Sequence, residues 1–273
     1  MIKDITLGQF FPGDSLLHKL DPGMKIILAV LFIVIVFLAK SPVAYAVILM
    51  FTVLLVLVSG IHLKTILKSM KPLVFVLIFT SLLNIFWTSG DKLLFSAGPV
   101  KIYAEGIEFA VLMIIRITVL LVSTTVILTY TTSPIMLTDG LERLLAPLKY
   151  IKVPVHEFSL MMTIALRFIP SLIEETDKIM SAQKARGADF SSGSIIDRAK
   201  ALIPVLIPLF VSAFRRADEL ATAMECRCYH GGEGRTKMTV TRITAADIIT
   251  LLVFIAVGVI VVCANNLTGG FHI

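Results

Sequence analysis

Cysteine, charge and catalytic motifs are all scarce in this sequence. Its 273 residues hold three cysteines, of which Cys226 and Cys228 form a C-x-C pair and Cys263 stands apart. An odd number with two cysteines so close together makes no disulfide framework, so a reducing environment suits the chain. The stretch before residue 24 lacks the apolar core that a cleavable signal peptide needs.

Charged residues make up 16% of the sequence and apolar residues 57%, with a mean hydropathy of +0.92. A soluble globular domain is about 45–50% apolar, so this excess predicts a protein whose surface faces lipid. The net charge of +6 could serve nucleic-acid binding, but the apolar runs make the inner surface of a membrane the better partner. We therefore expect contact with a lipid bilayer and no nucleic-acid partner.

No sequence motif points to catalysis. The run 231–237, GGEGRTK, resembles a P-loop in composition, but its glycine-to-lysine spacing is wrong. His156 begins a stretch like a zinc-protease helix that lacks the second histidine. The C-x-C-x-H run ending at His230 is tighter than the usual zinc spacing. We expect this chain to have no catalytic residue, no metal and no cofactor, and so not to be an enzyme.

Five apolar runs approach or reach the length that a helix needs to cross the roughly 30 Å hydrocarbon core of a bilayer. They are residues 24–39, 42–60, 72–87, 106–130 and 245–264. The first is short, and Lys25 and Lys40 at its ends are placed to extend into the polar interface. The pattern predicts an all-α membrane protein with about five transmembrane helices.

Positive charge orients these runs. The loop 61–71 carries three lysines and no acidic residue, which favours the cytoplasmic side. Five alternating crossings then put the N-terminus inside and the C-terminus outside. The expected parts are 1–130 with four spans, 131–244 as a cytoplasmic or interfacial coupling domain, and 245–273 with the last span and an extracellular tail.

Arg116 lies inside the fourth apolar run, where a charge at the helix centre costs about 2.5–3.5 kcal/mol. It could line a substrate or ion path, or it could face neighbouring helices and pair with backbone carbonyls. A single arginine makes no relay, which favours the second interpretation. Whether the apolar stretches 153–169 and 201–211 enter the membrane stays open, because their proline breaks would permit it.

The coupling domain contains two predicted amphipathic helices, about 171–187 and 209–229. Proline precedes each, and a capping box of Ser171 and Glu174 predicts that the first begins at residue 171. A glycine follows each helix and would end it.

Apolar residues recur at helical spacing in both helices, which predicts one apolar stripe on each. The stripe residues are Leu172, Ile173, Ile179, Met180, Leu209, Phe210, Ala213, Ala217, Leu220 and Met224.

Each predicted helix ends on an arginine between small residues. The two tripeptides are Ala185-Arg186-Gly187 and Cys226-Arg227-Cys228, which an offset of 41 residues superposes. A cation at a helix C-terminus gains about 0.3–1 kcal/mol from the helix dipole, so these are in part ordinary helix ends. Alternatively, each guanidinium enters a groove on a partner and meets carboxylates or carbonyls, which implies two partner copies. The residues alone leave both interpretations open.

Four segments, 10–26, 131–148, 165–190 and 215–229, together resemble the EcfT family over nearly the whole chain. EcfT is the transmembrane component of energy-coupling factor vitamin transporters, an ABC-type importer family of prokaryotes. The run ALRFIPSLIEETDKIMSAQKARGADF at 165–190 carries most of the resemblance.

The resemblance implies a multi-pass plasma-membrane scaffold without catalytic activity, in which partner subunits bind ATP. It joins two cytosolic ATPases to a membrane-embedded, substrate-binding S component during uptake of vitamins or related micronutrients. In that family two coupling helices end in Ala-Arg-Gly-type motifs that dock on the ATPases. Residues 185–187 match in full, whereas 226–228 keep the arginine and replace both flanks. The two apolar stripes are implied to contact the S component.

Two other functions fit the sequence less well. A self-sufficient secondary transporter needs intramembrane ionisable groups and repeated broken spans. Here the repeat lies in the coupling domain and Arg116 stands alone. A membrane-bound enzyme would need a group of catalytic residues, and no motif in this sequence indicates one. The sequence does not indicate which vitamin is carried, nor how many S components share the chain.

Overall fold

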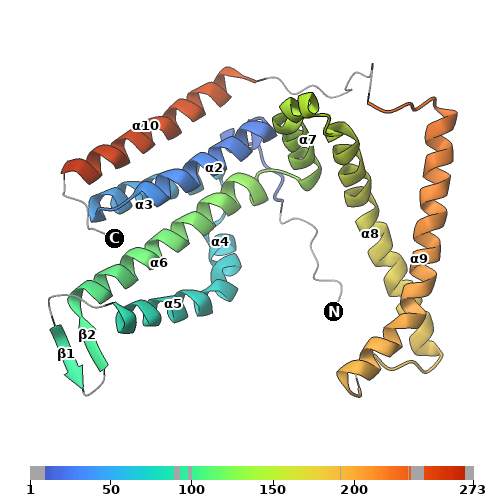
Figure 1. Cartoon of the computed structure of the whole chain (residues 1–273), viewed down its shortest axis with the longest axis horizontal. Helices are drawn as coiled ribbons and strands as arrows, with labels where there is room; N and C mark the ends of the chain where they lie inside the picture. Colours follow the sequence, from blue (N-terminus) through green and yellow to red (C-terminus); the bar gives the residue numbers. More distant parts are fainter. Residues whose placement is uncertain are drawn as a thin grey trace. The chain divides into compact units, whose positions relative to one another are not determined.

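The computed structural model of the chain describes residues 10–88, 93–97, 100–190, 192–232, 234 and 243–267. Helices dominate it (Figure 1), as the apolar runs predict. The fold divides into two compact units. We call Gly8–Leu141 with Thr241–Ile273 the bundle unit, and Glu142–Val240 the two-helix unit. The first nine residues and the tail from 268 onward, which were predicted to lie on opposite sides of the membrane, fall outside the described residues.

The bundle unit holds the apolar helices. Its helices are α1 (Leu16–Lys19), α2 (Pro22–Leu38), α3 (Pro42–Ser59), α4 (Leu63–Met70), η1 (Lys71–Leu73), α5 (Val74–Trp87), α6 (Ala104–Thr124), η2 (Thr125–Tyr130) and α10 (Ala245–Leu267). The helix α7 (Pro134–Leu145) begins in this unit, and η3 (Ala146–Ile151), α8 (Val155–Ala185) and α9 (Ile195–Cys226) belong to the two-helix unit.

Four helical stretches among the described residues are long and apolar enough to cross a membrane: 42–59, 63–87, 104–130 and 245–267. The predicted first span is α2, which has 17 residues and so a length of about 25 Å. Length and composition therefore support four spans. The fifth span and the N-in, C-out orientation stay predictions.

The all-α class is confirmed, and one loop adds a short hairpin to it. The loop expected at 88–105 contains two antiparallel strands, β1 (Leu93–Ala97) and β2 (Val100–Tyr103), with Ala97 paired to Val100. The sequence carried a signal for this hairpin, because two short runs rich in apolar residues are separated by a Gly-Pro dipeptide.

Local capping sets where α2 and α3 begin. The Asp21 carboxylate accepts from the Gly23 amide at 2.8 Å, and Ser41 Oγ accepts from the Ala44 amide at 3.2 Å. Each cap is followed by proline at the first helical position, where its missing N–H costs nothing.

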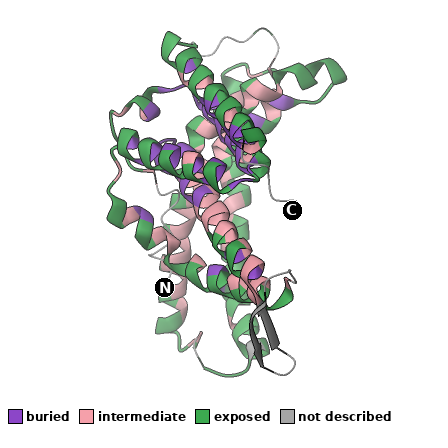
Figure 2. Cartoon of the chain, turned by 90° about the vertical axis from the view of Figure 1, so that its left-hand side faces the viewer, coloured by how far each residue is buried: buried purple, intermediate pink, exposed green. Residues whose placement is uncertain are grey.

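Aromatic packing joins three of the bundle helices. The rings of Phe32, Phe51 and Phe254, from α2, α3 and α10, lie with centroids 5.0–6.0 Å apart. Figure 2 shows the buried residues as stripes on the bundle helices, whose other faces are exposed and apolar.

Lys25 does not extend to the interface as predicted, because its side chain is only 1% exposed. Its ammonium donates to Thr131 O at 2.9 Å, Thr132 Oγ1 at 3.1 Å and His18 O at 3.3 Å. Three protein acceptors thus replace water around the charge, which is the condition for burying it. The buried carboxylates of Asp21 and Asp247 also act on it electrostatically.

Asp247 ties the start of α10 to the start of α2. One carboxylate oxygen accepts from the Thr244 amide at 2.7 Å, which caps α10, and the other accepts from the Asp21 amide at 2.9 Å. Residues 226 positions apart in sequence are therefore joined by a buried hydrogen bond.

Arg116 contacts the C-terminal end of α2. Its Nη2 donates to Ala39 O at 3.2 Å, and its guanidinium lies 5.5 Å from the Tyr45 ring centroid and 6.0 Å from that of Phe37. A cation at a helix C-terminus can donate hydrogen bonds to the carbonyls that have no partner within the helix. The contacts thus match the structural interpretation of this charge.

Replacing Lys25 tests how much the buried cluster contributes. Lys25→Ala would leave buried acceptors without a donor and two carboxylates without their nearby cation. We expect the free energy of unfolding in bicelles to fall by about 3 kcal/mol. Lys40→Ala, at an exposed position just beyond the opposite end of α2, should change it by less than about 0.5 kcal/mol. Equal losses for the two variants would contradict this role for Lys25.

Candidate functional site

The two coupling helices are longer than predicted. α8 has 31 residues and contains Pro170, and α9 has 32 residues and contains Pro204 and Pro208. The predicted starts at 171 and 209 are therefore wrong, as is the capping box at Ser171. A proline inside a helix removes one backbone hydrogen bond. In both helices, contacts with the other helix lie next to the prolines and support the helix there.

These contacts show that α8 and α9 run antiparallel, side by side (Figure 1). Gln183 Nε2 of α8 donates to Pro204 O of α9 at 3.4 Å. Further toward the start of α8, Arg216 Nη1 of α9 donates to Ser171 Oγ at 2.7 Å.

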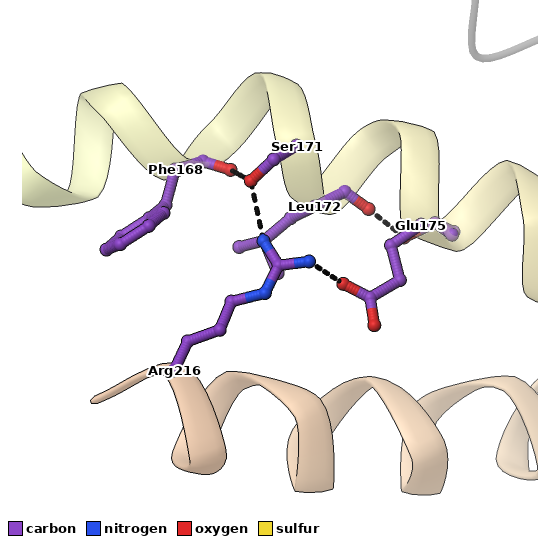
Figure 3. Close-up of polar contacts among 6 residues, drawn as sticks. Phe168, Ser171, Leu172, Glu175 and Arg216 are labelled. Carbon is purple, nitrogen blue, oxygen red and sulfur yellow. Dashed lines mark hydrogen bonds and ion pairs between the residues drawn. The ribbon is translucent and has the colours of Figure 1, made fainter. Parts of the chain in front are cut away.

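Arg216 is the strongest link between the two helices. Figure 3 shows its guanidinium reaching from α9 to α8, where Nη2 forms an ion pair with Glu175 and Nη1 bonds Ser171. Ser171 Oγ in turn donates to Phe168 O at 2.9 Å. Both charged side chains are less than a third exposed, so their pairing is stronger than that of a surface salt bridge.

The ion pair also marks the centre of the repeat. Glu175 and Arg216 are equivalent under the offset of 41, and Arg186 and Arg227 each lie eleven residues beyond them. At ~1.5 Å per residue, each terminal arginine is roughly 16 Å from the bridge along its own helix. Because the helices are antiparallel, the two arginines lie at opposite ends of the pair. The offset found in the sequence could have identified Glu175 and Arg216 as partners, but they were not singled out.

Both helices end with the same hydrogen-bond pattern, the Schellman motif. At α8 the Gly187 amide donates to Lys184 O at 3.0 Å and the Ala188 amide to Gln183 O at 3.0 Å. Gly187 has a φ of +91°, and Arg186 is the C-cap. The predicted end of this helix is confirmed.

α9 ends earlier than its predicted limit near residue 229. Arg227 is its C-cap, the Cys228 amide donates to Glu225 O at 2.8 Å, and the Tyr229 amide donates to Met224 O at 3.0 Å. Cys228 has a φ of +55°, so a cysteine occupies the left-handed position that Gly187 holds in α8. Arg227 therefore occupies the same C-cap position in α9 that Arg186 occupies in α8, despite the changed flanks.

The terminal arginine side chains are exposed, as are the residues on both sides of them. Within the described residues neither guanidinium forms an ion pair or hydrogen bond. The thiols of Cys226 and Cys228 are free and exposed, and the described residues contain no group of three or more metal-ligating side chains.

A groove of about 260 Å³ lies between the helices on the side of the Arg216 bridge that leads to the start of α8. It is lined by Ile164, Phe168, Leu172, Ala213, Arg216, Ala217, Leu220, Ala221 and Met224. Five of the ten stripe residues are thus brought together. The others, Ile173, Ile179, Met180, Leu209 and Phe210, lie outside the groove, and Phe210 is 61% exposed.

Residues 13–238 match the family model CbiQ, which is described as a cobalt transport protein. Proteins called energy-coupling factor transporter transmembrane protein EcfT are similar along almost the entire chain. The relative from Ruminiclostridium cellulolyticum is 56% identical over 249 residues, which cover 91% of this chain and 92% of its own. That from Bacillus subtilis is 48% identical over 259 residues, covering 94% and 97%.

We expect backbone strain at Cys228, because it has a positive φ. Cys228→Gly should stabilise the last turn of α9 by about 0.5–1 kcal/mol, and Gly187→Ala should destabilise that of α8 by about 1 kcal/mol, because side chains disfavour positive φ. Amide hydrogen exchange of the two last turns measures both effects. Cys226→Ala, inside the helix, is the control. Unchanged protection in Cys228→Gly would show that the cysteine is not strained.

A second prediction concerns the ion pair. Arg216→Glu and Glu175→Arg should each lower stability, whereas the double variant with exchanged charges should recover roughly 1 kcal/mol of the combined loss. Unfolding free energies of the four proteins give the interaction energy. Simple additivity would mean that the pair does not hold the helices together.

Proposed function

Because the chain belongs to the EcfT family of transmembrane components of energy-coupling factor transporters, we propose that it links two cytosolic ABC-type ATPases to a substrate-binding S component. The chain itself performs no catalysis in this proposal. ATP is bound and hydrolysed by the partners, which are two copies of one ATPase or two related ones. The complex resides in the plasma membrane of a bacterium, as the bacterial relatives suggest.

The matching helix ends are the main support for two ATPase docks. Arg186 and Arg227 share a C-cap position, are exposed, and have no intramolecular partner for their guanidinium groups in the described part of the chain. Arginine offers a fork of donors suited to carboxylates and carbonyls in a partner groove. The small residues 185, 187, 226 and 228 let each tip enter such a groove.

In the proposed mechanism, the two helices carry movement from the ATPases to the S component. ATP binding and hydrolysis move the two ATPases relative to each other, and each terminal arginine transmits that movement to one helix. Since the Arg216 bridge joins the helices midway, a displacement of the tips changes the angle between them. The S component then reorients and releases its substrate inside the cell.

The groove and the apolar stripes support contact with the S component. The groove is lined mostly by apolar and small side chains, which let another helix approach closely. Substrate choice would reside in the S component, so one coupler can serve several. We propose vitamins or related micronutrients as the substrates. The matching family model is described by cobalt transport, so identification of co-purifying small membrane proteins is needed to name the cargo.

Charge reversal at the helix tips tests this function. Arg186→Glu and Arg227→Glu should each weaken retention of the ATPases on the tagged chain by roughly tenfold or more, because buried arginines often dominate interfaces. Substrate uptake in proteoliposomes should fall in parallel, and the double variant should lose both activities.

Arg215→Glu, an exposed arginine in the middle of α9, is the matched control and should behave like the wild type. Full ATPase retention and full uptake in both tip variants would refute the docking role. A chain that purifies alone and still transports substrate would instead be a secondary transporter.

A further inference from the structure

The two arginine-bearing ends of the helix pair are closed in different ways. At the Arg186 end, α8 continues directly into α9 through residues 186–194, so the polypeptide itself joins the helices. Ser194 caps α9 together with Asp197, and the Gly193 backbone packs closely against the Asp197 side chain. The position of this end is therefore fixed by chain connectivity and local hydrogen bonds.

At the Arg227 end no short connection joins α9 to α8. The chain leaves α9 through Cys228 and turns at Gly231, which has a φ of +93°. It then reaches the first turn of α8. A Cβ atom on Gly232 would lie 2.6 Å from His156 Cδ2 and 3.0 Å from His156 Cγ, closer than real contacts allow. The imidazole thus packs directly on the Gly232 backbone, and a larger residue there would have to displace the ring.

The histidine ring is held from its other side by α7. His156 Nδ1 lies 3.2 Å from Glu142 Oε1, and the side chain of Glu142 is only 14% exposed. A carboxylate only accepts hydrogen bonds, so the Nδ1 proton is the one this contact requires. The Nε2 atom of the ring is buried and has no partner among the described residues. The orientation of the ring therefore comes from Glu142 and from packing on Gly232.

We propose that His156, oriented by Glu142 and packed on Gly232, is a positioning residue for the second ATPase dock at Arg227. Gly232 lies five positions after Arg227, so fixing the glycine against α8 restricts where the arginine points. This contact replaces, at the Arg227 end, the covalent connection that closes the Arg186 end. The inference rests on the proposed docking function and adds a specific role for three residues outside the tripeptides.

A set of double-variant comparisons tests this role with the ATPases that co-purify with the wild-type chain. His156→Ala should weaken their binding to the chain in nanodiscs by roughly five- to tenfold, in keeping with a lost anchor residue at an interface. In an Arg227→Ala background the same change should weaken it less than about twofold, because that dock is already lost. In an Arg186→Ala background the full effect should remain.

Gly232→Ala repeats the test without touching His156 or Glu142, and should lose most of its effect when combined with His156→Ala. His230→Ala, an exposed histidine on the same segment, is the control and should bind normally. Thermal unfolding of each variant reports folding separately. Equal effects of His156→Ala in both arginine backgrounds, or none in either, would overturn the positioning role. If Arg186→Ala and Arg227→Ala alone leave binding unchanged, the docking function itself fails, and this inference with it.

Discussion

The ion pair between Arg216 and Glu175 sets the register at which the two long helices meet. A guanidinium that also bonds Ser171 resists sliding of one helix past the other, because a shift of one residue would break two charge-assisted contacts together. The residues of this link are equivalent under the 41-residue repeat, so the link lies at the centre of the pair. The two terminal arginines are consequently displaced by equal lengths of helix in opposite directions. A symmetric spacing of this kind suits two similar partners.

The bundle unit relies on a different buried polar contact. Lys25, Asp21 and Asp247 lie among apolar helices, yet each has partners: backbone acceptors and a hydroxyl for the ammonium, backbone amides for both carboxylates. Apolar packing between lipid-facing helices has little directional preference, whereas hydrogen bonds from one residue to particular neighbours do. The cluster therefore specifies which ends of α2 and α10 meet, and the three phenylalanines fill the space between those helices and α3.

The helix ends show where local sequence rules work and where they fail. Gly187 was recognised as a helix terminator because glycine adopts positive φ easily. Cys228 takes the same conformation, although side chains disfavour positive φ. The sequence instead predicted that a glycine further along would end α9. The prolines led to the opposite error, because helix breaks were predicted where the helices continue. Pro170, Pro204 and Pro208 were expected to lie before the two helices, but they lie inside α8 and α9, where contacts between the helices hold the turns on both sides of them.

The sequence by itself determined that the chain is an apolar helical protein, where most spans lie, and that two amphipathic helices carry equivalent arginines. Those features follow from periodicity and composition, which act between neighbours in the chain. The tertiary structure decided the burial of Lys25, the pairing of Arg216 with Glu175 and the packing of His156 on Gly232. Each of these depends on side chains or backbone brought together from distant positions, and the energy of such a contact exists only once both helices are in place.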